Sequence, residues 1–104
     1  MIRTEKELER RNRILVARAA YAYEILDSPV LTDSQFDDLA KSIRPEMSTI
    51  EDYHSPEQIS RYTELDRFFK EQFSAYTGSW IRKHPEYSKL EVMAHSYQYD
   101  PELS

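Results

Sequence analysis

Hydrophobic residues recur at steps of three and four along most of the chain, the spacing of one face of an α-helix. This spacing predicts helices over residues 5–27, 33–44 and 57–77, and a shorter one within 80–97. In the first helix, apolar side chains lie within roughly 40° of the direction of Leu8 and predict its core face. These are Leu8, Leu15, Ala19, Ala22 and Leu26.

Helix start and stop signals agree with these ranges. Three expected helices open on Ser or Thr with Glu or Gln three residues later, the capping-box pattern: Thr4 with Glu7, Thr32 with Gln35, and Ser55 with Gln58. Pro29 and Pro45 end the first two helices, since the residue before a proline avoids the helical region. The short connection makes these two an αα-hairpin. The third helix either ends at Gly78 or runs through it.

The composition supports an all-α fold of one domain. The chain has 104 residues with one glycine and no cysteine, so hairpin turns, disulfides and thiolate metal sites have almost no residues to build them. We expect a single helical domain over 1–104, in which the hairpin at 12–45 packs against the helices of 55–97 and residues 98–104 form a loose tail. No apolar run approaches the ~20 residues of a membrane span and no signal peptide is evident, which favours the cytoplasm.

Charge is distributed unevenly along the chain. The formal net charge is -5, yet residues 1–18 carry six Arg or Lys and only three Glu. An acidic chain with one basic helix face is not typical of a general nucleic-acid binder, so direct nucleic-acid binding is not expected.

Enzyme and metal signatures are missing from the sequence. A Gly-rich phosphate loop cannot be built with one glycine. The three histidines, His54, His84 and His95, are far apart and none belongs to a metal-binding motif, so no metal site is predicted.

One run of residues at the hairpin has a distinctive order. Tyrosines, an aspartate two residues before a proline, and two further aspartates follow at fixed spacing: Tyr21, Tyr23, Asp27, Pro29, Asp33 and Asp37. This resembles the Ia domain of bacterial NAD-dependent DNA ligases, a short helical module that precedes the adenylation domain. The resemblance covers roughly residues 12–45, about a third of the chain.

The resemblance implies binding of the nicotinamide mononucleotide half of NAD. In that family aromatic rings hold the nicotinamide and carboxylates bond the ribose and amide. Carried over, Tyr23 matches a stacking ring, and Asp33 and Asp37 match the carboxylates. Glu24 stands where the family has histidine, and Phe36 stands where it has tyrosine. The nucleotidyl-transfer motif of that family, lysine-x-aspartate-glycine, is absent, so we expect no catalysis from this chain. The resemblance implies a module separated from its enzyme, as often happens in phages and other mobile elements.

The first helix also carries a second apolar and basic face. Its members are Arg10, Arg11, Ile14, Arg18 and Tyr21. A helix with two apolar faces contacts two things, and Arg and Tyr are enriched in interface hot spots. Either this face binds a protein partner or a second copy, or the third or fourth helix covers it within the domain.

Two functions follow from the sequence. The preferred hypothesis is a non-catalytic module that binds NAD or nicotinamide mononucleotide, related to DNA ligation or replication and able to assist such an enzyme in trans. The alternative is a helical interaction adaptor that uses the Ile14, Tyr21 and arginine face.

Overall fold

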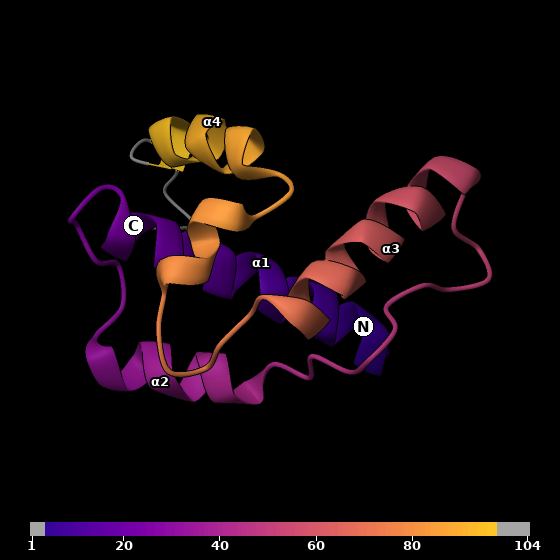
Figure 1. The fold of residues 1–104 in the computed structure, drawn as a ribbon, viewed down its shortest axis with the longest axis horizontal. Coiled ribbons are helices and arrows are strands. Elements are labelled where there is room, and N and C mark those ends of the chain that lie inside the picture. Colours follow the sequence, from indigo (N-terminus) through magenta and orange to yellow (C-terminus); the bar gives the residue numbers. More distant parts are fainter. Residues whose placement is uncertain (1–3, 98–104) are drawn as a thin grey trace.

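The computed structural model describes residues 4–97 and has four α-helices and one 3-10 helix, with no strand in that range (Figure 1). The elements are α1 (Glu5–Glu24), α2 (Asp33–Ser42), α3 (Pro56–Glu71), η1 (Ser79–Lys83) and α4 (Tyr87–Tyr97). The predicted all-α class is therefore confirmed. The predicted loose tail at 98–104 lies outside the described residues. No helix within them is both long and apolar enough to cross a membrane.

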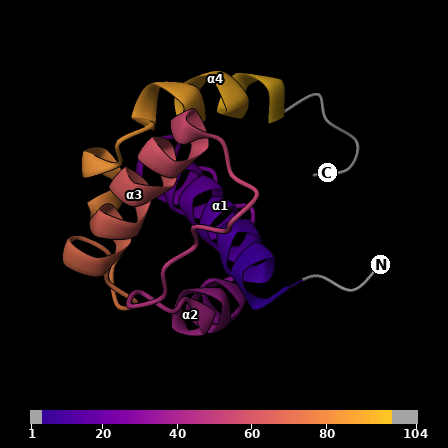
Figure 2. The same ribbon diagram turned by 90° about the vertical axis from the view of Figure 1, so that its right-hand side faces the viewer.

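Helix α1 is the central element of the domain. Seen along its length, it lies in the middle with α2 below it, α3 to the left and α4 above (Figure 2). Backbone contacts join α1 to α2, α4 and η1. Among the described residues α3 makes no comparable backbone contact with another helix, and it meets the rest of the domain through its side chains.

The helix starts follow the predicted capping patterns, with one difference. Thr32 and Ser55 form complete capping boxes with Gln35 and Gln58. At Thr4 only half of the box is present: its hydroxyl accepts the Glu7 N–H at 3.1 Å. These bonds satisfy backbone donors that the first turn of a helix leaves without partners.

The predicted core face of α1 is wrong in part. Ala19 and Ala22 are buried, but Leu8 and Leu26 are 45% and 39% exposed. The face turned inward holds residues of mixed polarity: Glu9, Arg13, Val16, Ala17, Ala20 and Tyr21. Apolar periodicity could not find this face, because small alanines and an ion pair occupy it in place of large aliphatic side chains.

The third helix ends at Glu71, earlier than the prediction of residue 77. The chain then turns back, so that Trp80 of η1 packs against α3 rather than continuing beyond it. Its ring centroid lies 5.0 Å from that of Phe73 and 5.9 Å from that of Phe69, and its indole N–H donates to the Thr77 carbonyl at 2.8 Å. A continuous helix would carry Trp80 away from these rings at about 1.5 Å per residue.

A buried arginine joins the elements that the backbone contacts leave apart. Arg13 of α1 bonds Glu9 at 2.8 Å and Asp66 of α3 at 2.7 Å, and it donates to the carbonyl oxygens of Arg44 and Met47. Asp66 in turn accepts both the backbone N–H and the hydroxyl of Thr49. One network therefore fixes α1, α3 and the 43–55 segment together.

Replacing Arg13 by methionine should destabilise the domain by about 3–5 kcal/mol, because the Glu9 carboxylate would stay buried without its cation. Urea unfolding followed by circular dichroism measures the change. Arg11→Met, on the exposed side of the same helix, is the matched control and should shift stability by less than about 0.5 kcal/mol. Equal unfolding midpoints for both variants would show that the Arg13 network does not stabilise the domain as predicted.

Protonation of His84 should weaken the fold in mild acid. Burial lowers the pKa of His84 to about 4, and its ring packs on Phe68 and Phe69. An unfolded-state histidine titrates near 6.5, so between about pH 6.5 and 4 the unfolded chain binds a proton that the folded chain does not. Folding stability is therefore lost as pH falls through that window, by about 2 kcal/mol between pH 7 and 4.5.

The variant His84→Gln isolates this contribution, because an amide can accept the Glu86 N–H that the imidazole accepts at 3.0 Å. Urea unfolding of both proteins at about pH 7 and pH 4.5 should show the larger acid loss in the wild type. The same loss in both would show that carboxylates alone cause it.

Candidate functional site

A pocket of about 450 Å³ opens where the end of α1 meets the start of α2. The five residues expected to bind a cofactor all line it: Tyr23, Glu24, Asp33, Phe36 and Asp37. The αα-hairpin brings them together, since the connection returns the chain so that the first turn of α2 faces the last turn of α1. The volume falls in the range of small-molecule sites, roughly 300–1,000 Å³.

Three of these side chains make no hydrogen bond, ion pair or ring contact with other side chains of residues 4–97. Tyr23 is 53% exposed, Asp33 is exposed on the first turn of α2, and Asp37 is exposed one turn later. Within residues 4–97 no hydrogen bond or ion pair engages either aspartate carboxylate, and the helix cap is made by Thr32 instead of Asp33. Phe36 differs, because it is half-buried against the core cluster. The two aspartates and Tyr23 are thus available to a ligand.

Glu24 sits at the junction of three segments. Its carboxylate lies 3.5 Å from the Arg82 guanidinium of η1, and Arg82 also donates to the Glu24 carbonyl at 3.4 Å. The Glu24 side chain packs on Gly78, where an added Cβ would come within 3.1 Å of it. Arg82 therefore partly offsets the Glu24 charge, and Gly78 leaves room for that side chain.

The aspartate before the proline has a backbone role. Asp27 adopts φ 50°, the left-handed region, which aspartate tolerates better than most residues. The chain turns there, and the Ser28 N–H reaches back to the Ala22 carbonyl at 3.0 Å. Asp27 does not line the pocket; it shapes the turn that carries Pro29, Val30 and Leu31 to the pocket wall.

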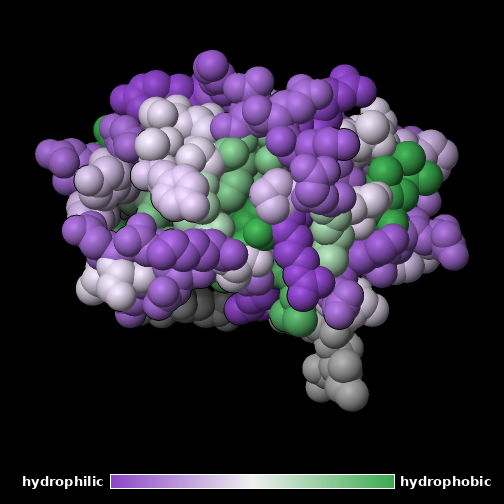
Figure 3. Space-filling model, turned by 60° about the horizontal axis from the view of Figure 1, so that its bottom comes forward, coloured by the Kyte–Doolittle hydropathy of each residue, from purple (hydrophilic) through white to green (hydrophobic). Residues whose placement is uncertain are grey.

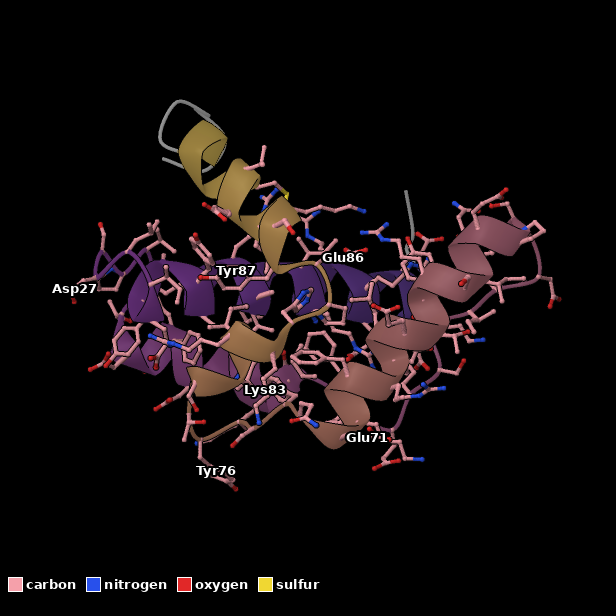
Figure 4. All side chains as sticks on the ribbon, turned by 45° about the horizontal axis from the view of Figure 1, so that its top comes forward. Asp27, Glu71, Tyr76, Lys83, Glu86 and Tyr87 are labelled. Carbon is pink, nitrogen blue, oxygen red and sulfur yellow. The ribbon has the colours of Figure 1, made fainter. Side chains whose placement is uncertain are left out.

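Sequence reasoning missed the wall contributed by residues 76–78. Tyr76, Thr77 and Gly78 line the pocket, and Tyr76 is 88% exposed on the loop between α3 and η1, pointing away from the domain (Figure 4). The helical spacing of the third apolar series had placed Tyr76 inside a helix. The run of small and polar residues from Ser74 to Ser79 was the signal that a loop lies there.

The electrostatics of the pocket are one-sided. Glu24, Asp33 and Asp37 are the charged residues in its lining, which holds no lysine or arginine. Aromatic faces and carboxylates together attract a cationic ring. No group of three or more histidine, aspartate or glutamate side chains among the described residues could hold a metal ion.

The second face of α1 is largely occupied by the domain itself. Tyr21 is buried, with its ring centroid 5.4 Å from that of Tyr87 of α4. Burial, with the nearby Tyr87 and Glu91, raises the pKa of the Tyr21 phenol. The sequence left open whether a partner or another helix of the domain covers this face. For Tyr21, the fourth helix covers it.

The four other residues of that face have different surroundings. Arg10 bonds the Thr49 carbonyl at 2.6 Å and Glu51 at 2.8 Å, which ties the 43–55 segment to α1. Arg11 is exposed. Ile14 and Arg18 line a groove between α1, α3 and α4, and Arg18 donates to the Met93 sulfur at 3.3 Å.

Comparisons with protein-family models, with curated proteins and with solved structures find no match.

Proposed function

We propose that the chain is a non-catalytic helical module that binds the nicotinamide mononucleotide half of NAD in the pocket between α1 and α2. The observation that carries the proposal is that the five positions expected to contact the ligand, Tyr23, Glu24, Asp33, Phe36 and Asp37, line one pocket. A role beside an enzyme of DNA ligation or replication follows from the same resemblance.

The chemistry of the lining fits the nicotinamide end of such a ligand. An oxidised nicotinamide ring carries a positive charge, which the faces of Tyr23 and Phe36 and the neighbouring carboxylates attract. Asp33 and Asp37 can accept hydrogen bonds from ribose hydroxyls or the amide. The phosphate is the less favoured part, because Glu24 adds negative charge to the same pocket.

The interaction adaptor is the second candidate. The fold itself covers Tyr21 and holds Arg10, so these two residues are not available to a partner. The observation that favours the adaptor is the groove that Ile14 and Arg18 line.

The first test is whether the chain forms a covalent nucleotide adduct. We expect no transfer of an adenylate group from NAD or ATP to the purified protein, because the sequence has no lysine-x-aspartate-glycine motif. Intact-mass spectrometry after incubation measures this, and an added adenylate mass would overturn the non-catalytic assignment.

The second test addresses the ligand. Isothermal titration should show nicotinamide mononucleotide binding to the wild type and a loss of about tenfold or more for Asp37→Ala, which removes a charge-assisted bond worth ~1.5–3 kcal/mol. Asp38→Ala removes another exposed carboxylate of the same helix that does not line the pocket, and this variant should bind as the wild type does.

A third variant, Glu24→His, restores the residue of the ligase family. It should raise affinity, since a carboxylate repels the phosphate and an imidazole does not. If none of the wild type, Asp37→Ala and Glu24→His gives heat with the mononucleotide or with NAD, the nucleotide function is wrong.

A further inference from the structure

A second concave site lies beside α1, and the proposed nucleotide pocket does not use it. Because α3 stands off from its neighbours, a groove of about 200 Å³ remains between α1, α3 and α4. Its floor includes the buried side chains of Ala17, Phe69 and Leu90. Ile14, Leu65 and Met93 also line it and keep part of their surface accessible, and Ile14 is 46% exposed.

Most charged side chains in the walls of the groove are cationic. Arg10, Arg13, Arg18, Arg61 and Lys89 line it, against the single carboxylate of Glu86. Acidic partners outside the groove lining offset the first two, since Arg10 bonds Glu51 and Arg13 bonds Glu9 and Asp66.

The end of the groove nearest α4 keeps an excess of positive charge. Arg61 of α3 bonds Glu86 through two nitrogens at 2.6 and 2.9 Å, and Lys89 of α4 lies 3.4 Å from the same carboxylate. These bonds, that of Arg61 first, lower the pKa of Glu86, so it stays ionised. One carboxylate thus faces two cations here.

We propose that this groove docks an acidic amphipathic helix of a protein partner. Such a helix would place two or three apolar side chains against the accessible surfaces of Ile14, Leu65 and Met93, and its Glu or Asp residues beside Arg61 and Lys89. Helix-in-groove recognition uses apolar anchors at i, i+3 or i+4 and i+7. Rim charges of opposite sign steer the encounter and fix its orientation.

The size of the groove favours side chains over a free small molecule. Its volume lies below the roughly 300–1,000 Å³ of ligand pockets, and it is an open trough with a mostly apolar floor. A few anchoring side chains fit that space while the partner backbone stays outside. On the face shown in Figure 3, hydrophilic side chains separate the hydrophobic areas. The proposal refines the adaptor function and does not depend on the nucleotide pocket.

The probe is a designed helical peptide of about 18 residues, roughly five turns, with leucines on one face and glutamates flanking them. Its control has lysine in place of every glutamate. In a two-dimensional NMR titration the glutamate peptide should shift the backbone signals of Ile14, Leu65 and Leu90, and binding should weaken in about 0.5 M salt. The lysine peptide should produce no such shifts. Equal binding of both peptides, or shifts confined to other surfaces, overturns the proposal, as does no binding of the glutamate peptide.

Two pairs of variants locate the site. Ile14→Asn should weaken peptide binding by about tenfold, whereas Leu8→Asn, at 45% exposure on the same helix but outside the groove, should not. Lys89→Glu should weaken it by about threefold to tenfold, and Lys83→Glu, outside the groove, should leave it unchanged.

Sedimentation equilibrium of the chain alone should show a monomer. A dimer that Ile14→Asn dissociates would assign the groove to a second copy and overturn the proposal.

Discussion

The buried guanidinium of Arg13 is the interaction on which the arrangement of the helices depends. It is 5% exposed, lies 5.0 Å from the Phe69 ring centroid, and bonds α1 to α3 and to two backbone carbonyls of the 43–55 segment. A planar group with five donors can serve several acceptors at fixed angles, which lysine could not do. Glu9 completes the network, because its carboxylate accepts from both Arg13 and the Arg44 N–H.

This polar link explains why the domain has a groove. Helices that pack through apolar ridges approach to about 8–10 Å, but α3 is held by Asp66, Phe68 and Phe69 without a comparable approach of backbones. The space left beside Leu65 and Ile14 is filled only in part, by Met93 and Leu90 of α4. The ion pair of Arg13 and Asp66 thus holds α3 at a distance from α1 that leaves the groove between them.

The sequence predicted the helices better than their packing. Local signals suffice for a helix start, and Thr32 and Ser55 cap the helices that their patterns indicate. Which face turns inward is a tertiary property: Leu8 and Leu26 face solvent, while Arg13 is buried by partners 31 to 53 residues away. The family resemblance named the pocket residues of the hairpin, and its motif occupies one short continuous stretch of the chain. Tyr76 and Gly78 were missed because a loop brings them from the far side of α3.

The two concave sites have opposite charge, which constrains how the molecule can work. Three carboxylates and no cation line the pocket at Tyr23, whereas five cations and one carboxylate line the groove at Ile14. Glu51, Glu9 and Asp66 offset Arg10 and Arg13, so the positive excess of the groove is at Arg61 and Lys89, which share one carboxylate. A cationic ring and an acidic helix would therefore suit different sites. Both sites are nevertheless built on α1, at its last turns and along its middle. A chain with a nucleotide bound in the pocket and a protein bound in the groove would bring the two together. That role would need no catalytic group in the chain itself.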